Sequence, residues 1–473
     1  MKTITTERIF GASGYHKKEP PLRSPFQIDR DRIIHSSAFR RLRNKTQVFG
    51  VYTLDYYRTR LTHSLEVSQI ARSIASNINN AHGLSIDLDL IEAISLAHDI
   101  GHPPFGHLGE EIINDKLKML VSGRYGFEAN AQNIRILNFL EKKIYDPENK
   151  RLCGLNLTFK TVDGILKYKL PFKYSDKCRH FMYDSDEFIL RHLHGNEFIE
   201  FLKENAENIN KKENKKIKEF FFEVTRSLEC QILNAADDIA YATHDIEDGV
   251  ESGLIDLSGH TQIKKYLSEE KDDEDMEKIE ADIDNFFNNI SKILSPYNSY
   301  NLYDNAMPNL KKKIDLKEFF SNYISKFIIN IDIKERFGLF KGSPFNEPVP
   351  GIDLNNDSYK YMLVWKNDIN KEIKALKKIS YKLVMEHREI LLNRYRAKNI
   401  LGKLFDLFSN TDNLRLYPDD FQELYENDFY GEYEADNICV MCRDYISGMT
   451  DIYAIKLYST LFETGNIAEL SPY

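Results

Sequence analysis

Apolar residues recur at three- and four-residue steps along most of this chain, and this spacing predicts α-helices. Between residues 62 and 78, with Thr62 as a candidate cap, the apolar positions share one helix face: Leu65, Val67, Ile70, Ala71, Ile74 and Ile78. A second helix is expected over 85–99, where Ser85 can cap the start and Gly101, Pro103 and Pro104 end it. The same spacing predicts helices over 30–43, 215–249, 266–295, 312–332, 359–409 and 435–463.

One segment has a different period. Leu155, Leu157 and Phe159 alternate with polar residues, and a period of two is that of a β-strand. We therefore expect a short strand or hairpin near 154–170. The fold class that follows is all-α: a mainly helical bundle with a small β-hairpin and additional C-terminal helices.

Composition agrees with a helical protein and bears on its division into domains. The chain has 473 residues, of which only 22 are glycine and 14 proline, too few for an all-β fold with many turns. At about 150 residues per domain the length suggests roughly three domains, or one large domain with insertions. Because no Gly-, Ser- or Pro-rich linker and no internal repeat divides the chain, we expect one interlocked body over 1–473.

The charge balance argues against a protein whose surface is built for nucleic acid. Lys and Arg number 64 against 73 Asp and Glu, which gives a net charge of −9. A local basic run remains: Arg30, Arg32, Arg40, Arg41, Arg43 and Lys45. It could bind phosphates, a regulatory nucleotide or single-stranded DNA, or it could pair with acids on a helix surface, and both interpretations stay open. The charged stretch 267–285 is expected to be a solvated helix or an insertion.

Several features bear on the cellular compartment. No stretch approaches the length of about 18 apolar residues that a membrane-spanning helix needs, and the first ten residues, MKTITTERIF, lack the apolar core of a signal peptide. Five cysteines do not make a disulfide framework in so long a chain. We expect a cytoplasmic protein without membrane contact. Cys439 and Cys442 form a C-x-x-C inside an apolar helical run, which favours core packing over zinc binding.

Metal-ligating and acid–base side chains are concentrated in the segment 98–110, HDIGHPPFGHLGE. Neutral imidazole and carboxylate oxygen suit a divalent transition metal, and His63 upstream and Asp237 downstream can complete the ligand set. On a helix, Asp237, Tyr241 and Asp245 are spaced i, i+4 and i+8, so that all three project from one face. Such a face could form one wall of a pocket.

Taken together, these motifs resemble the deoxynucleoside triphosphate triphosphohydrolases of the HD superfamily, whose type members are the bacterial dGTPases. The matching stretches follow the family order over residues 29–454: 29–42 (DRDRIIHSSAFRRL), 45–49 (KTQVF), 60–67 (RLTHSLEV), 98–110, 126–132 (GFEANAQ), 154–158 (GLNLT), 235–239 (AADDI) and 444–451 (DYISGMTD). The resemblance implies a metal-dependent hydrolase that converts a deoxynucleoside triphosphate, dGTP among them, to a deoxynucleoside and inorganic triphosphate.

By this resemblance, four residues hold the metal: His63, His98, Asp99 and Asp237. The implied ion is Mn²⁺ or Mg²⁺, with Fe, Co, Ni and Zn as further candidates. The metal would polarise the phosphoryl oxygen or activate the attacking water.

The resemblance also implies roles in the reaction and in substrate binding. His107 matches the catalytic histidine, which would protonate the leaving 5′ oxygen, and Glu110 matches its acidic partner. His102 and Arg60 match residues that contact phosphate. On the sugar side, Gln47 and Asp245 match residues that hydrogen-bond the 3′-hydroxyl, and Tyr241 matches a tyrosine beneath the deoxyribose that leaves no room for a 2′-hydroxyl.

The sequence departs from the family after the Gly-Phe-Glu stretch, where some relatives have a further active-site histidine and this chain has Ala129 and Asn130. No histidine role can be transferred there. The residues that read the base and the γ-phosphate lie in variable helices and are not assigned, and neither are the base preference and the effector. Two other functions stay open: another HD-superfamily nucleotide phosphohydrolase or phosphodiesterase, and a nucleotide- or single-strand-binding regulator with a vestigial site.

The resemblance further implies an architecture and partners. An HD catalytic core is expected over 55–250, with an insertion at 140–230 that includes the hairpin, and a helical region over 251–473 would complete the pocket and the oligomer contacts. We expect a homo-oligomer, a hexamer or another even-numbered assembly, with a dNTP substrate and a regulatory dNTP or single-stranded DNA as candidate partners.

Overall fold

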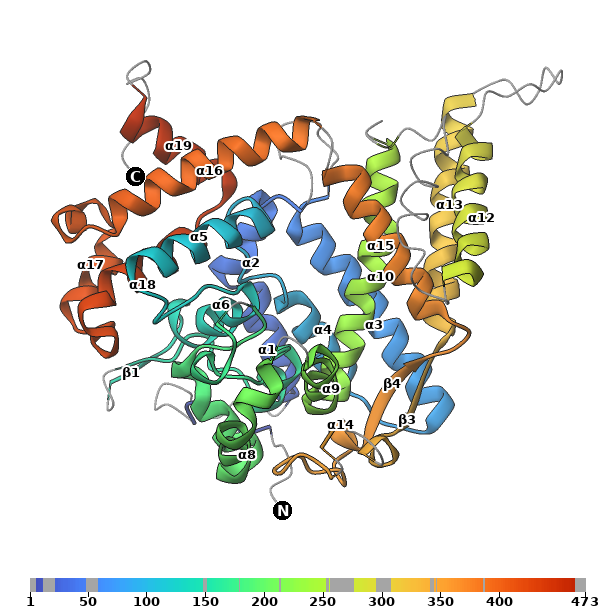
Figure 1. Cartoon of the computed structure of the whole chain (residues 1–473), viewed down its shortest axis with the longest axis horizontal. Coiled ribbons are helices and arrows are strands. Elements are labelled where there is room, and N and C mark those ends of the chain that lie inside the picture. The colour runs from blue at the N-terminus through green and yellow to red at the C-terminus, as the bar shows by residue number, and fades with distance from the viewer. Residues whose placement is uncertain are drawn as a thin grey trace.

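The computed structural model describes residues 6–11, 22–47, 58–147, 151–177, 179–211, 214–251, 255, 276–294, 308–340, 344–345, 347–385 and 388–463. Across these residues the chain is mainly helical, and strands form only two antiparallel pairs (Figure 1). The predicted all-α class with a small hairpin is therefore confirmed. None of the helices in this part of the chain is long and apolar enough to cross a membrane. Cys178 and the start of the helix expected over 266–295, residues 266–275, lie outside the described residues.

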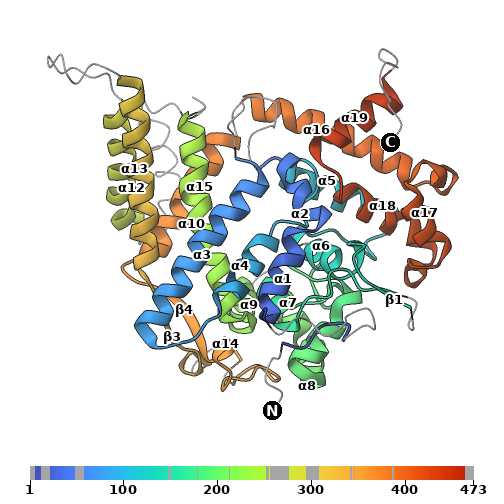
Figure 2. The same cartoon turned by 180° about the vertical axis from the view of Figure 1, so that it is seen from behind.

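Four helices form the centre of the molecule: α1 (Pro25–Ile34), α3 (Arg60–His82), α4 (Leu88–Ala97) and α10 (Leu228–Glu251). α3 packs against both α4 and α10, and α1 packs against α4 (Figures 1 and 2). The apolar face predicted for α3 is buried at Val67, Ala71 and Ile74, whereas Leu65 is half exposed. Burial of this face holds α3 against α4 and α10, and candidate site residues lie at the start of α3, after the end of α4 and in the middle of α10.

The starts of α3 and α4 differ from the predicted caps. The Thr59 side chain accepts from the Thr62 N–H and the Thr62 side chain reciprocates, so Thr62 is the third residue of a capping box and not the cap itself. α4 begins after Asp87, whose carboxylate accepts the N–H groups of Asp89 and Leu90, instead of at Ser85. An aspartate can accept both N–H groups at once, which explains the later start.

The single helix predicted over 30–43 is broken into α1, α2 (Ser37–Arg41) and the short 3₁₀ helix η1 (Leu42–Asn44). Ser36 has extended backbone angles, and its side chain accepts the N–H of Phe39, which starts a new helix. Because of this break, the chain changes direction within the basic run 30–45. Lys45 directly follows η1, and its side chain is buried.

The hairpin predicted near 154–170 is misplaced. It lies at β1 (Tyr145–Asp146) and β2 (Arg151–Leu152), while the following segment holds a helix, α7 (Phe159–Ile165). Asn156 has a positive φ of 46°, which breaks any strand, and Thr158 caps α7. The alternation reflects an irregular turn in which Leu155 and Leu157 are both buried, so a period of two does not identify a strand here.

A second hydrophobic core lies under the C-terminal helices. α5 (Gly106–Leu120) packs against α16 (Arg388–Phe408), and α18 (Asn437–Ser447) packs against both, with α17 (Asp419–Glu426) beside α18 and α19 (Asp451–Phe462) beside α16 (Figure 1). Cys439 and Cys442 are buried in this core, which confirms that they pack against apolar neighbours. The C-terminal helices thus cover the helix that carries His107 and Glu110.

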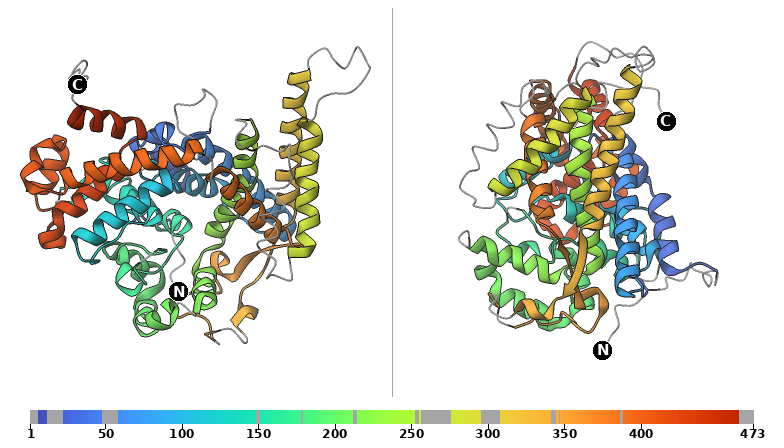
Figure 3. Two further views of the ribbon diagram at one scale, coloured as in Figure 1. Left: turned by 45° about the horizontal axis from the view of Figure 1, so that its top comes forward. Right: turned by 90° about the vertical axis from the view of Figure 1, so that its right-hand side faces the viewer.

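On the opposite side, α12 (Met276–Leu294) and α13 (Pro308–Ile329) stand side by side as a pair (Figure 3). α13 leads into β3 (Ile331–Glu335), which pairs with β4 (Tyr361–Trp365) in the register Ile331 to Trp365. The helix predicted over 359–409 therefore starts late, because the run Tyr-Met-Leu-Val-Trp favours a strand. α15 (Ile369–Met385) then packs on α10.

The remaining described elements connect these layers. They are the helices α6 (Ala129–Arg135), α8 (Glu187–Asn210), α9 (Lys215–Thr225) and α14 (Asp357–Lys360), the π-helical turn η2 (Ile136–Leu140), and the 3₁₀ helices η3 (Phe172–Tyr174), η4 (Asp184–Asp186), η6 (Phe337–Phe340), η7 (Thr411–Leu416) and η8 (Gly431–Asp436).

Candidate active site

Three helices bring the four predicted metal ligands together. His63 lies in the first turn of α3, His98 and Asp99 follow the end of α4, and Asp237 lies in the middle of α10. His63 Nε2 is 3.1 Å from Asp237 Oδ1, and His98 Nε2 is 3.7 Å from the same oxygen and 3.5 Å from Asp99 Oδ1. One nitrogen or oxygen atom from each of His63, His98 and Asp99 lies within 4.8 Å of the others. This is the spacing that ligands around one ion would have.

The orientation of His98 suits a metal ligand. Its Nδ1 lies 2.6 Å from the carbonyl oxygen of Ser95, so that nitrogen donates, and Nε2 keeps its lone pair. Nε2 is buried and makes no hydrogen bond among the described residues. A buried acceptor without a donor is costly, and a divalent cation would satisfy it. The donor set of imidazole nitrogen and carboxylate oxygen therefore fits a divalent metal ion.

Asp99 is held as a carboxylate by the side chains around it. Burial alone would raise its pKa, but His102, Arg60 and His98 hold the pKa of Asp99 well below its ordinary value. Arg60 Nη1 donates to Asp99 Oδ2 at 2.8 Å, and both side chains are buried. Gly106 leaves room for this arginine, because a Cβ there would lie 2.8 Å from Arg60 Nη2. Arg60 thus touches a predicted metal ligand.

His107 and Glu110 form a second group at the start of α5. His107 Nδ1 is 3.2 Å from Glu110 Oε2, and Glu110 Oε1 accepts the N–H of Ala129 at 2.8 Å. Burial alone would raise the pKa of Glu110, but the contact with His107 holds it below its ordinary value. The His107 side chain is 66% exposed, and its ring lies edge-on to that of His102. An exposed imidazole beside a fixed carboxylate can pass a proton to a bound molecule.

The third wall of the site carries the residues predicted to hold the sugar. The ring of Tyr241 lies 5.1 Å from that of His63, centroid to centroid. Burial raises the pKa of Asp245 to about 7. Both polar atoms of the Gln47 amide are buried without a hydrogen-bond partner among the described residues. Such an amide is free to bind a ligand that enters the site.

A cavity of about 500 Å³ joins these groups. Of the predicted site residues it is lined by Gln47, His98, Asp99, His102, His107, Glu110, Asp237, Tyr241 and Asp245. Arg60 and His63 do not line it and lie behind Asp99 and Asp237, which they contact. The volume is in the usual range for a small-molecule site. We call it the active-site cavity below.

The cavity also contains cations that the sequence motifs did not single out. Lys167, Arg179 and Lys377 line it, from three separate segments of the chain. Lys377 projects from α15, forms an ion pair with Asp238, and lies 5.4 Å from the centre of the Tyr241 ring. No motif marks these residues: Lys167 lies in the stretch predicted as a strand or hairpin, Lys377 in a predicted helix, and Arg179 in neither.

Comparison with protein families matches two parts of the chain. Residues 60–148 match the HD domain, and residues 363–460 match a phosphohydrolase-associated domain. The HD match contains His63, His98 and Asp99, together with His107 and Glu110. Asp237 lies beyond it, on α10.

Curated proteins match almost the whole chain. Three examples, all named deoxyguanosinetriphosphate triphosphohydrolase-like protein, illustrate the match. The one from Nitrosomonas europaea is 32% identical over 94% of this chain and 93% of its own length. That from Shewanella pealeana is 34% identical over 97% and 96%, and that from Brucella anthropi is 32% identical over 94% and 91%.

Proposed function

This chain belongs to the family of deoxyguanosinetriphosphate triphosphohydrolase-like proteins and contains an HD domain, and from this premise we propose that it hydrolyses deoxynucleoside triphosphates, dGTP among them, to a deoxynucleoside and inorganic triphosphate. The observation that carries the proposal is the meeting of two groups in one cavity. One is a buried set of imidazole and carboxylate ligands, and the other is the His107–Glu110 pair.

We assign the metal to His63, His98, Asp99 and Asp237, with Mn²⁺ or Mg²⁺ as the proposed ion and Fe, Co, Ni or Zn as alternatives. When bound there, a divalent ion polarises a phosphoryl oxygen and lowers the pKa of a bound water. Arg60 Nη1 orients Asp99 through its hydrogen bond to Oδ2, and the guanidinium adds positive charge where the α-phosphate gains negative charge.

In the proposed reaction, water attacks the α-phosphorus and the 5′ oxygen leaves. His107, held by Glu110, gives its proton to that oxygen. His102 stands beside His107 and would contact a phosphate oxygen. Products are the deoxynucleoside and the intact triphosphate, because the bond that breaks joins the α-phosphorus to the 5′ oxygen.

For the substrate we propose two sets of contacts. Gln47 and Asp245 would bind the 3′-hydroxyl, and the Tyr241 ring would lie beneath the deoxyribose and exclude a 2′-hydroxyl. Lys167 and Lys377 would meet the β- and γ-phosphates, since both residues line the cavity that also contains His98, Asp99 and Asp237. Burial alone would lower the pKa of Lys167, but Tyr168 and Asp237 raise it, so this lysine is charged.

The test is to incubate the pure protein and Mn²⁺ with each of the four dNTPs and identify the phosphorus products by ³¹P NMR. We expect inorganic triphosphate as the only phosphate product. Release of phosphate or pyrophosphate alone would favour another HD-superfamily phosphohydrolase, and binding without any turnover would favour a regulator with a vestigial site. His107→Ala is the matched control: it should lose turnover and keep its metal content.

The organisation of the whole protein is proposed on the same basis. We propose a catalytic core over 55–250 and a helical region over 251–473 that completes the active-site cavity and mediates a cytoplasmic homo-oligomer. Lys377 and Tyr381 support the first point, because both lie in the later region and line the cavity. Light scattering after size-exclusion chromatography measures the assembly, for which we expect an even number of subunits.

A further inference from the structure

A further group of metal-ligating side chains lies in the active-site cavity. Among the described residues, His102, His107 and Glu110 each offer one nitrogen or oxygen atom, and these three atoms lie within 4.8 Å of one another. All three residues line the cavity, and none of them belongs to the four predicted metal ligands. We call His102, His107 and Glu110 the second cluster below.

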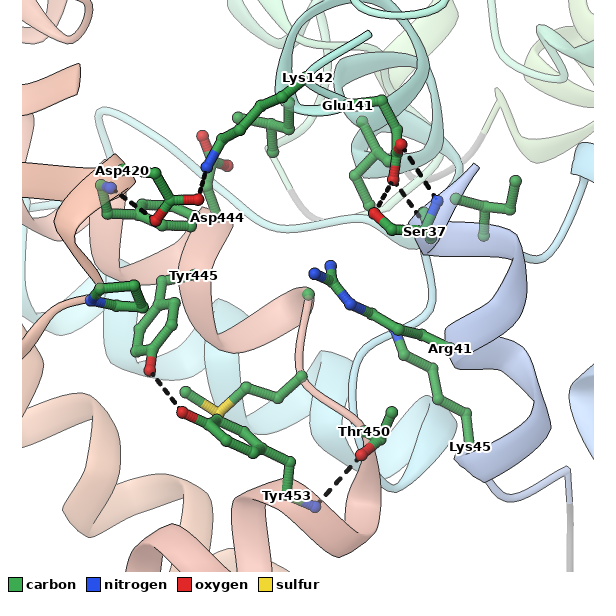
Figure 4. A pocket seen from close by; sticks show the side chains of 18 residues that line it. Ser37, Arg41, Lys45, Glu141, Lys142, Asp420, Asp444, Tyr445, Thr450 and Tyr453 are labelled. Atoms are coloured by element: carbon green, nitrogen blue, oxygen red, sulfur yellow. Dashed lines mark hydrogen bonds and ion pairs between the residues drawn. The ribbon is translucent and has the colours of Figure 1, made fainter. Parts of the chain in front are cut away.

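His102 is held from two sides in an orientation that suits a ligand. Its Nδ1 lies 3.0 Å from Asp99 Oδ1, which leaves Nε2 as the nitrogen that can bind an ion. A histidine whose other ring nitrogen faces a carboxylate is the usual arrangement at a metal. The carbonyl oxygen of His102 accepts from the buried Lys45 Nζ, which also donates to the Ser447 carbonyl oxygen. Figure 4 shows Lys45 in the wall of a separate cavity behind this contact.

The chain between His102 and α5 is fixed as well. Phe105 has a positive φ of 61°, a conformation that a non-glycine residue keeps only where its surroundings hold it. Here the Asp451 carboxylate accepts the N–H groups of Phe105 and Thr46, at 3.0 Å each. The distance from His102 to the first turn of α5, where His107 lies, is therefore set by contacts that need no ion.

Glu110 and His107 differ in how firmly they are held. Glu110 Oε1 accepts the Ala129 N–H at 2.8 Å, and Oε2 lies 3.2 Å from His107 Nδ1. Ligand atoms around a tetrahedral zinc ion lie about 3.3 Å from one another, so this pair already has the required spacing. The His107 ring lies 5.3 Å from that of His102, centroid to centroid. Because the His107 side chain is 66% exposed, its ring can rotate to bring the third ligand atom into range.

The donor set of the second cluster favours one class of ion. Imidazole nitrogen suits Zn²⁺, whereas Mn²⁺ and Mg²⁺ prefer oxygen ligands. Zinc also binds to three protein ligands and leaves a fourth position for water. The four predicted ligands of the first site include two carboxylates, but the second cluster has only one carboxylate beside two imidazoles. The two sets therefore differ in the ion that they select.

From this geometry we propose that His102, His107 and Glu110 form a second metal site, which binds Zn²⁺ and stops turnover while it is occupied. The binding of zinc depends only on the ligand atoms. The effect on turnover rests on the proposed function, because an imidazole bound to an ion cannot give a proton to the leaving 5′ oxygen. An ion there also occupies the place where a phosphate oxygen would contact His102.

The binding test counts zinc ions per chain by inductively coupled plasma mass spectrometry, after dialysis of the full-length protein against a fixed concentration of free Zn²⁺. Because the first site can also take zinc, each variant is made in the parent protein and in Asp237→Ala. His107→Ala should lower the count by one ion per chain in both backgrounds. The exposed side chain of His107 makes loss of folding an unlikely cause.

His35→Ala is the matched control for His107→Ala, because His35 is an exposed histidine that does not line the active-site cavity. It should keep the zinc count of its parent. Glu110→Gln removes the carboxylate ligand and should weaken zinc binding at least about tenfold in a titration against a competing chelator. Equal zinc counts in His107→Ala and His35→Ala, or an unchanged zinc affinity in Glu110→Gln, would overturn the proposal.

Inhibition is tested at saturating Mn²⁺ with added Zn²⁺. Turnover by the parent should fall as zinc is added and should stay low when the Mn²⁺ concentration is raised, because the two ions are bound by different residues. The residual turnover of Glu110→Gln should need at least about tenfold more zinc for half inhibition. Recovery at higher Mn²⁺ would mean that zinc displaces the ion of the first site, and would refute the inhibitory effect.

The zinc counts and the reaction products separate this proposal from the proposed function. A zinc ion that is lost in His107→Ala, in a protein that releases phosphate or pyrophosphate instead of triphosphate, would support the second site and refute the proposed reaction. Triphosphate release by a protein whose zinc count does not change in His107→Ala would support the reaction and refute the second site.

Discussion

The Glu110 side chain makes two contacts with different consequences. Its Oε1 accepts the Ala129 N–H and fixes the carboxylate, and its Oε2 faces His107 Nδ1. The first contact is to the backbone, so it survives the loss of charge when glutamine replaces glutamate. The second contact needs the charge, because a carboxylate favours a protonated imidazole and an amide does not. The two contacts can therefore be separated by a single substitution.

We predict that Glu110→Gln lowers kcat by about 10- to 100-fold, within the range of general acid catalysis, and leaves KM nearly unchanged. Steady-state kinetics with the best dNTP measures this. Asp115→Asn is the control, since Asp115 is an exposed residue of the same helix that does not line the active-site cavity. A rise in KM without a fall in kcat would show that Glu110 serves binding and not proton transfer.

A second prediction concerns Asp186, which is fully buried where η4 leads into α8. Burial raises the pKa of Asp186 from its ordinary 3.8 to about 7. The folded protein therefore favours the protonated form of Asp186. Because the unfolded chain ionises this group near pH 4, the free energy of unfolding falls as pH rises from about 4 to about 7 and does not fall further above that. Asp186→Asn removes this loss. Urea unfolding measures this: the gain in the free energy of unfolding from Asp186→Asn should be larger at pH 8 than at pH 5 by at least about 1 kcal/mol.

The exposed Asp115 provides the comparison for Asp186. Asp115→Asn should change stability by less than about 0.5 kcal/mol at either pH, as is usual for a surface position. An equal effect of Asp186→Asn at pH 5 and pH 8 would mean that this carboxylate is ionised in the folded protein at both.

Helix α5 owes its position to close backbone contact. A Cβ at Gly109 would lie 2.0 Å from the carbonyl oxygen of Pro104, so the helix can approach the preceding loop only with glycine there. His107 and Glu110 stand on the same turn. Any shift of the helix moves both groups relative to His102 and the predicted metal ligands.

We predict that Gly109→Ala destabilises the protein by about 1–3 kcal/mol and lowers kcat at least tenfold. Gly402→Ala is the matched control in α16, because the nearest atom to its added Cβ is 3.7 Å away. That substitution should stabilise by up to about 1 kcal/mol through helix propensity. Urea unfolding and initial rates test both, and full activity in Gly109→Ala would show that α5 tolerates the shift.

The elements differ in how well the sequence predicted them. α3 and α4 follow from their apolar spacing, and only their first residues differ, since a cap depends on which nearby oxygen reaches the N–H groups. The prediction of a strand near 154–170 was wrong, because Leu155 and Leu157 are buried in a turn in which Asn156 has a positive φ. β4 was missed because five strand-favouring residues stand next to long helical spacing.

The site was easier to predict than its surroundings. The resemblance carried by the motifs predicted His63, His98, Asp99 and Asp237 as one ligand set. In the structure, ligand atoms of His63, His98 and Asp99 lie within 4.8 Å of one another, and Asp237 Oδ1 is 3.1 Å from His63 Nε2. Their roles remain predictions. Lys377 could not be anticipated, because its place in the cavity depends on a tertiary approach between segments that carry no shared motif.

For the molecule as a whole, the proposed metal joins three helices, α3, α4 and α10. Ligands from separate helices bind only in the folded state, so a bound ion stabilises folding by mass action. We predict that removal of the ion by EDTA lowers Tm by several degrees, corresponding to about 3 kcal/mol when the free ion is at 100 times its Kd. Differential scanning calorimetry measures the shift. Asp237→Ala should show little response to EDTA, and an unchanged Tm in the parent protein would count against a metal at these residues.

Asp451 also fixes when the site can form during synthesis. Its carboxylate holds Thr46 and Phe105, next to Gln47 and close to His107, yet it is made more than 340 residues after Phe105. On the ribosome, the HD core can fold with its ligands in place long before this contact exists. The loop between the predicted metal ligands and α5 is then completed only when residue 451 has left the exit tunnel. A nascent chain that ends before residue 451 would carry the predicted ligands without the contacts that hold Thr46 and Phe105 in place.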